Sequence, residues 1–188
     1  MGALQVRASG VWARKQWIAE HHGEAGYDVL ARELSPAGRL LLREPIDPKQ
    51  WINYLLFIEV VIAMDRVFGA GDGTLAIELG RDSAHRNTST VLKPFIRLGS
   101  VGWVLRRASK VWREHFSEGA FEVRFDEPAR TAEGEIVDFP YPHIVHTYTV
   151  LGFAIGCVEL SGASDVTGQV ASCRSRGADR TLLRVRWA

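Results

Sequence analysis

The residues best suited to chemistry lie in one polar run, residues 81–90, inside a region that otherwise carries apolar residues at helical spacing. An acid, an imidazole, a guanidinium and an amide follow one another there as Asp82, His85, Arg86 and Asn87. These groups can hydrogen-bond a small molecule or a partner protein. The run also fits a solvated face on which the helix bends or ends, because Ser, Thr and Asn compete with helical backbone bonding. We take the four residues as candidates for a ligand or partner surface.

Metal binding finds little support in the sequence. His21 and His22 are adjacent, so they would point to different faces of a helix, and a polar helix end explains them better. The two cysteines, Cys157 and Cys173, are too few for a disulfide framework. With a nearby histidine they would make only an improvised site, whereas buried cysteine is an ordinary core residue. We expect no bound metal and no cofactor.

Catalytic constellations are equally scarce. The glycine-rich stretch at residues 69–73 lacks the Lys-Ser/Thr ending of a phosphate-binding loop and follows no clear strand, so it predicts a turn. Glu59 is a carboxylate inside a strongly apolar stretch, and a hydrogen-bonded structural acid is the simpler interpretation. There is no nucleotide fingerprint and no recognisable nucleophile–base pair. We therefore expect a protein that is not an enzyme.

Length and charge exclude several other classes. The 188 residues suit a single domain over residues 1–188. Lys and Arg number 23 and Asp and Glu 22, so the net charge of +1 gives no general attraction to nucleic acid or to an acidic membrane. The first residues lack the basic region and apolar core of a signal peptide, and no apolar run reaches the about 20 residues of a membrane span. We expect a cytoplasmic protein that neither crosses a membrane nor binds nucleic acid.

The elements that position these residues begin with a central helix. Residues 51–68 are apolar on almost every face, which predicts a buried helix that begins at Asp47-Pro48. Other helices are expected on each side of it: 11–22, 24–33, one from Ser35-Pro36, one from Asp72, and an amphipathic helix from Ser100 to Phe116.

The spacing of apolar residues changes to two after residue 120, which is typical of half-buried strands. Two strands are predicted at 121–125 and 135–139, a helix at 143–160, and two closing strands at 166–173 and 181–187. This order predicts an α+β fold, in which a helical N-terminal half packs on a mainly antiparallel four-stranded sheet.

The closing segment carries a resemblance to a known family. Cys173, Gly177 and the alternating strand that ends at Trp187 resemble the end of the 4-vinyl reductase domain, where Cys, Gly and a second Cys are spaced by three residues. Its relatives include components of the transport protein particle (TRAPP) and, more distantly, haem nitric-oxide-binding domains. Residues 78–84 and 99–112 resemble a stand-alone myxobacterial branch. Thr181 replaces the second cysteine, which argues against the family's zinc site.

The resemblance implies a regulatory domain that binds a small apolar or aromatic ligand, with Trp103, Trp112 and Phe153 in the cavity wall. The alternative is a dimerising scaffold that binds a second copy or another protein. A haem-based gas sensor, with His85 as the iron ligand, is placed third because the Tyr-x-Ser-x-Arg motif of the haem-binding relatives is absent.

Overall fold

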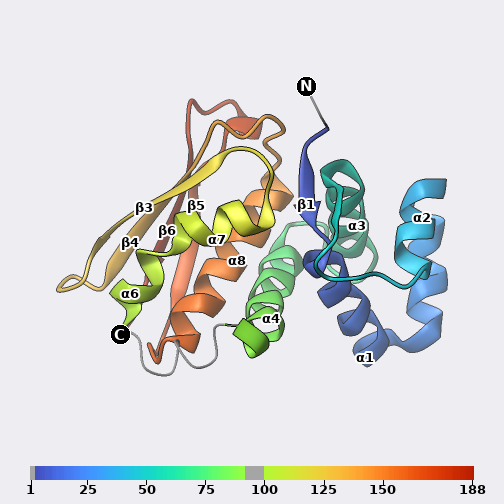
Figure 1. Cartoon of the computed structure of the whole chain (residues 1–188), viewed down its shortest axis with the longest axis horizontal. Coiled ribbons are helices and arrows are strands. Elements are labelled where there is room, and N and C mark those ends of the chain that lie inside the picture. Colours follow the sequence, from blue (N-terminus) through green and yellow to red (C-terminus); the bar gives the residue numbers. More distant parts are fainter. Residues whose placement is uncertain (1–2, 92–99) are drawn as a thin grey trace.

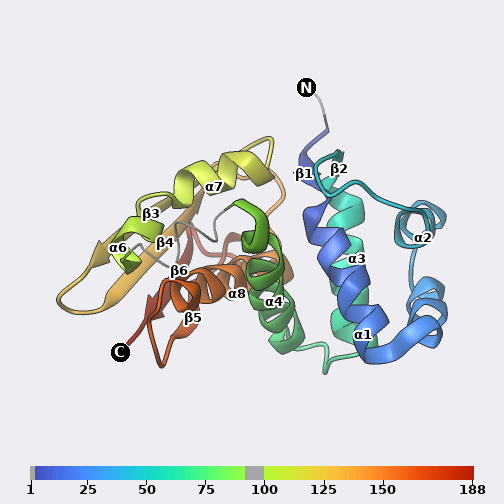
Figure 2. The same cartoon turned by 60° about the horizontal axis from the view of Figure 1, so that its bottom comes forward.

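A helical half and a sheet-containing half lie side by side in the protein (Figure 1). The computed structural model describes residues 3–91 and 100–188, without the side chains of residues 87–91. Helices α1 to α3 form one side, the four-stranded sheet forms the other, and helices α4 and α8 lie between them (Figures 1 and 2). The predicted α+β fold, with helices in the N-terminal half and an antiparallel sheet in the C-terminal half, is confirmed.

The described elements follow in this order: β1 (Gln5–Arg7), α1 (Ser9–Arg32), α2 (Pro36–Arg43), β2 (Trp51–Asn53), α3 (Tyr54–Val67), α4 (Thr74–Val91), α6 (Val101–Leu105), α7 (Ala108–His115), β3 (Ala120–Asp126), β4 (Thr131–Val137), α8 (Ile144–Leu160), β5 (Thr167–Ser172), the 3-10 turn η1 (Arg174–Arg176) and β6 (Thr181–Arg186).

The central helix begins later than the sequence predicts. The Asn53 side chain accepts a hydrogen bond from the Leu55 backbone N–H at 2.8 Å and caps α3, so the start at Asp47-Pro48 was wrong. Residues 51–53 instead form β2, which pairs antiparallel with β1 in a small separate sheet. Asn caps helices as well as Asp does, and a Trp-Ile pair favours a strand, so the local signals there competed.

The break predicted at Gly23 between helices 11–22 and 24–33 is confirmed: α1 is interrupted there by non-helical backbone, and the φ of 58° suits glycine. Two other helix limits differ from expectation. The helix predicted from Ser100 to Phe116 is divided into α6 and α7 at residues 106–107. Helix α4 runs on to Val91, through the run where a bend or end was expected, because its inner face packs closely on α8.

The four-stranded sheet has the order β3-β4-β6-β5, and all its neighbouring strands are antiparallel. Leu183 and Val185 of β6 are buried while Arg184 and Arg186 point outward, as the alternation predicted. Helix α8 lies against β5 and β6, and α7 lies against β3.

Helices α4 and α8 touch backbone to backbone through glycines. A methyl group on Gly80 would lie 2.2 Å from the Thr149 carbonyl oxygen, and one on Gly152 would lie 1.9 Å from the Ile77 carbonyl oxygen. Both distances are far below van der Waals contact, so neither position has room for a side chain. These glycines set the distance between the two helices.

Eight of the 14 residues of α3 are buried, and the helix packs on α1, α2, α4 and α8. Its apolar length does not make it a membrane segment: within residues 3–91 and 100–188, no helix is long and apolar enough to cross a bilayer.

We predict that Val61→Asp lowers the free energy of unfolding by roughly 3–5 kcal/mol. Val61 is fully buried, so the new carboxylate would lose its contact with water and lie unpaired in the apolar core. Leu55→Asp on the same helix is the control, since Leu55 is 54% exposed. Urea unfolding followed by circular dichroism measures both. Equal stabilities for the two variants would show that α3 is not the core of the fold.

We predict that Gly152→Ala destabilises the protein by about 2 kcal/mol or more, because the new methyl group forces α4 and α8 apart. This reverses the usual gain of about 1 kcal/mol when Gly becomes Ala inside a helix. Gly102→Ala in α6 is the control, because part of what its methyl group meets, at 3.1 Å, is the flexible Glu127 carboxylate. Thermal unfolding should separate the two; a stabilised Gly152→Ala protein would contradict the close approach.

Candidate functional site

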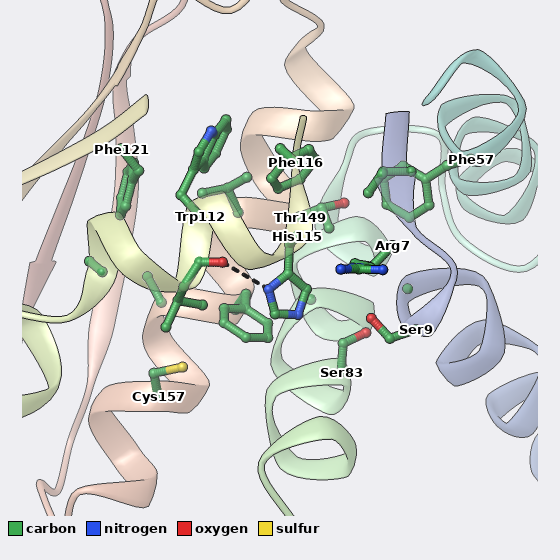
Figure 3. A pocket seen from close by; sticks show the side chains of 18 of the residues that line it. Arg7, Ser9, Phe57, Ser83, Trp112, His115, Phe116, Phe121, Thr149 and Cys157 are labelled. Atoms are coloured by element: carbon green, nitrogen blue, oxygen red, sulfur yellow. Dashed lines mark hydrogen bonds between the residues drawn. The ribbon is translucent and has the colours of Figure 1, made fainter. Parts of the chain in front are cut away.

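A cavity of about 140 Å³ lies where the two halves of the protein meet. Its walls come from β1, the start of α1, α3, α4, α6, α7, β3 and α8. The walls are mainly aromatic and aliphatic, and the rings come from Phe57, Trp112, Phe116, Phe121 and Phe153 (Figure 3). A concave apolar site with a few polar groups is the usual form of a ligand pocket.

His115 is one of the polar residues that line the cavity. It lies at the end of α7, and its Nδ1 is 2.9 Å from the Val111 carbonyl oxygen (Figure 3). A carbonyl oxygen only accepts, so Nδ1 carries the proton and the lone pair of the neutral ring is on Nε2. The ring lies between the aromatic side chains of α7 and the serines of α1 and α4 (Figure 3). His115 can therefore offer Nε2 to an electron-pair acceptor in the cavity.

Arg14 is a second unusual group in the cavity wall, because it is only 1% exposed. Its Nη1 donates to the Gly10 carbonyl oxygen at 3.0 Å and to the Ser83 hydroxyl at 2.6 Å. The guanidinium carbon also lies 5.3 Å from the centre of the Phe57 ring. Burial lowers the pKa of Arg14 to about 10, opposed by the charge of Asp82, so the group stays protonated at neutral pH.

The two cysteines lie at different places. Cys157 lines the cavity, and burial raises the pKa of its thiol to about 12, which makes it unreactive. The Cys173 sulfur lies 3.3 Å from the hydroxyl of Thr147 on α8. Along that helix, Thr147 is about 15 Å from Cys157 at the helical rise per residue. The idea that the two thiols share a metal is therefore wrong. Within residues 3–91 and 100–188, no three His, Cys, Asp or Glu side chains come close enough together to hold a metal ion.

His146 of α8 lies behind the cavity in a cluster of aromatic rings. Its ring stacks on Phe139 at 4.8 Å between centres and meets Phe116 at 5.1 Å and Tyr54 at 5.3 Å. Burial, with a smaller contribution from the nearby charges of His143 and Arg14, lowers the pKa of His146 to about 3. The His146 ring is therefore held in its neutral form.

The seven residues proposed from the sequence divide into two groups. Trp112 and Phe153 line the cavity, and Trp112 is held there by a hydrogen bond from its indole N–H to the Glu118 carbonyl oxygen at 3.1 Å. Trp103 does not line it; the Arg107 guanidinium lies 3.5 Å from the centre of its ring.

Asp82, His85 and Arg86 of the polar run on α4 do not line the cavity. Asp82 accepts a hydrogen bond from Arg86 at 2.6 Å, and Arg86 also pairs with Glu20 of α1. His85 lies 3.5 Å from the Glu159 carboxylate. The side chain of Asn87 is outside the described part of the chain. The serine between these residues, Ser83, is the one that lines the cavity.

Sequence reasoning missed His115, Arg14, Ser9 and Ser83 as site residues. A signal for Arg14 was present, because it lies three residues after Val11 and four before Ile18, on the stripe that α1 buries. An arginine on such a stripe indicates a buried cation. His115 lies on the inner face of α7, but the sequence alone gave no reason to separate it from a core residue.

No family profile and no curated protein matches the sequence. Solved structures do match, and the fold that they share with this chain is that of H-NOX domains. An oxygen-binding H-NOX domain related to soluble guanylate cyclases, solved with oxygen, is 11% identical, with a TM-score of 0.63 over 96% of this chain and 94% of that one.

Two structures from Shewanella oneidensis are similar to the same extent. Its H-NOX protein in the Fe(II)NO state is 10% identical, with a TM-score of 0.69 over 97% of this chain and 99% of that one. A mutant of an H-NOX domain from the same organism in the Fe(II)CO state is 9% identical, with a TM-score of 0.71 over 96% and 98% of the two chains.

These structures correct the family resemblance drawn from the sequence. The neighbours are H-NOX domains, so the assignment to the 4-vinyl reductase and transport-particle (TRAPP) group was wrong, although haem nitric-oxide-binding domains had been included as distant relatives. The function drawn from that group is overturned too, both the regulatory domain for a non-haem apolar or aromatic ligand and the scaffold alternative. The weak motif matches misled because the closing hairpin, with its Cys and Gly, is a local feature, whereas the helices around the cavity distinguish the fold.

We predict that the protein loses stability in acid through His146. The unfolded chain takes up a proton near the ordinary histidine pKa of 6.5, whereas the folded chain does so only near 3. The unfolded state therefore binds more protons between these values, and the free energy of unfolding falls as the pH falls from 6.5 to 3, by up to about 1.4 kcal/mol per pH unit.

His146→Leu should flatten this decline, measured by urea unfolding at several pH values. His21→Leu is the control, because His21 is exposed and should leave the slope unchanged. The same pH slope in the wild type and in His146→Leu would show that His146 is not held neutral.

Proposed function

We propose that the protein is a haem-binding sensor domain whose cavity would hold the haem, with His115 as the residue that would bind its iron. Binding, not catalysis, is its proposed activity. The titles of the structural neighbours describe oxygen-binding, Fe(II)NO and Fe(II)CO states, and haem iron in this cavity would supply a coordination position for such a diatomic gas.

His115 is the observation that carries the proposal. Haem iron in proteins is commonly held by a neutral histidine whose other ring nitrogen donates a hydrogen bond. His115 has this arrangement, because Val111 fixes the proton on Nδ1 and the ring lines an apolar cavity. His85, the ligand considered from the sequence, is exposed beside Glu159 of α8 and does not line the cavity.

The chemistry of the remaining lining suits a tetrapyrrole with acidic side chains. Trp112, Phe121 and Phe153 offer apolar and aromatic surface that excludes water. Arg7 and Arg14 supply positive charge in the same wall. The described residues thus provide a ligand for the metal, walls for the ring and cations for its carboxylates.

The size of the cavity sets a condition on this proposal. About 140 Å³ is close to the ~150 Å³ of an engineered cavity that takes up benzene, and small-molecule sites usually exceed about 300 Å³. Haem is much larger than benzene. Its binding therefore requires α6 and α7 to move away from α4 and α8, which is feasible because α7 packs chiefly on β3.

We predict that the purified protein, mixed with haem under reducing conditions, gives a Soret band and retains one haem per chain through gel filtration. His115→Ala should lose the haem on the column or shift the Soret band, and added imidazole should restore the wild-type spectrum, because it replaces the missing ligand.

His21→Ala is the matched control. The Nδ1 of His21 also bonds a carbonyl oxygen four residues earlier, that of Trp17 at 2.8 Å, but His21 is exposed and does not line the cavity. A wild-type protein with no Soret band after haem addition would overturn the proposed function. Haem binding that His115→Ala leaves unchanged, but His85→Ala abolishes, would move the ligand to α4.

A further inference from the structure

The guanidinium of Arg14 is placed where a cation is costly. It sits on the buried stripe of α1, against the Phe57 ring, and lines the apolar cavity. A charge taken out of water needs a counter-charge or a full set of hydrogen bonds to offset its desolvation, which otherwise costs several kcal/mol. Arg14 has only part of such a set.

One edge of the guanidinium is completely unused. Nη1 is satisfied by Gly10 and Ser83, but Nε and Nη2 are buried and have no hydrogen-bond partner among the described residues. These two nitrogens are neighbours on the planar group, and their N–H bonds point the same way. That edge is the one that binds both oxygens of a carboxylate at once.

No acid of the described part of the chain occupies this edge. Asp82 acts on Arg14 only through its charge and spends its hydrogen bond on Arg86. The hydroxyl of Ser9, which also lines the cavity, is likewise buried without a partner, so it offers one more donor nearby. The unsatisfied groups are thus donors, and one of them is a cation.

We propose that Arg14, supported by Ser83 and Ser9, forms a carboxylate-binding subsite in the wall of this cavity. The subsite fixes the acidic end of the bound molecule and the aromatic rings receive its apolar part. The inference rests on the proposed function only in taking this cavity as the ligand site. The carboxylate is either a side chain of haem or that of a free aromatic acid, and the two sources are distinguished below.

The experiment compares a carboxylate with its neutral isostere on the haem-free chain. Isothermal titration with benzoate and benzamide uses probes of the size that the cavity holds. We expect benzoate to bind the wild type at least tenfold more tightly than benzamide. Arg14→Met should abolish this preference while raising the melting temperature, because it removes a buried unpaired charge. Arg14→Lys should keep part of the preference, because it keeps the charge but not the paired donors.

Arg81→Met is the matched control. Arg81 lies on α4 two residues before Ser83, pairs with Glu159 at 2.7 Å and does not line the cavity, so its removal should leave the benzoate preference unchanged. Equal affinity for the two probes, no binding of either probe, or the same preference in Arg14→Met would each overturn the subsite. A lower melting temperature of Arg14→Met with no change in the preference would mean that water satisfies the guanidinium and the residue is structural.

A second titration, with haem and haem dimethyl ester, identifies the source of the carboxylate. If the wild type prefers haem to its ester and Arg14→Met loses this preference, the subsite binds a carboxylate of haem. Benzoate selectivity without any haem binding keeps the subsite, assigns it to a free acid and overturns only the proposed function. Suppose that wild type and Arg14→Met each bind haem and its ester equally, and that benzoate is not selected. That result would overturn the subsite but not the proposed function.

Discussion

The close approach of α4 and α8 is the constraint on which the rest of the structure depends. Gly80 and Gly152 let the two backbones touch, and any side chain at either position would separate them. The separation decides what each helix presents to the cavity: Ser83 from α4, and Thr149, Phe153 and Cys157 from α8. Helix α3 and the sheet then pack on the two outer sides of this pair, as Figure 2 shows. The described walls of the cavity therefore depend on the backbone contact between these two helices.

The cavity combines two kinds of surface that ordinary cores keep apart. The sheet side and α7 contribute rings, whereas α1 contributes a buried cation with unused donors. His115 and His146 illustrate the difference that position makes. His146 is enclosed by aromatic rings, among them Phe116 and Phe139, and is kept neutral. His115 lies near Phe153, is half-buried and lines the cavity. Such partly satisfied polar groups cost stability in the free chain, which is common where a protein binds something.

The order of elements was readable from the sequence, because the spacing of apolar residues changes clearly after residue 120 and caps such as Ser35 and Ser100 marked helix starts. The start of α3 was not readable, because Asp47 and Asn53 are both good helix caps. Only the pairing of β1 with β2 decides between them. The site was harder still. Trp112 and Phe153 followed from apolar spacing, but Arg14 and Ser83 meet across 69 residues of chain, and no local pattern records such a contact. The family resemblance rested on short motifs, whereas the solved structures that match over the whole fold are H-NOX domains.

The ion pair between α1 and α4 has a consequence for the conditions in which the protein works. Arg86 of α4 reaches across to Glu20 of α1 at 2.8 Å and also holds Asp82, and it is 21% exposed. Dissolved ions weaken partly exposed pairs of this kind, because they screen charges over about 8–10 Å at physiological concentrations. Arg14 belongs to α1 and Ser83 to α4, so the Arg86–Glu20 ion pair joins the two helices that carry these parts of the cavity wall. The strength of this ion pair depends on ionic strength. Salt concentration would then set how firmly the two walls are held together, independently of anything bound between them.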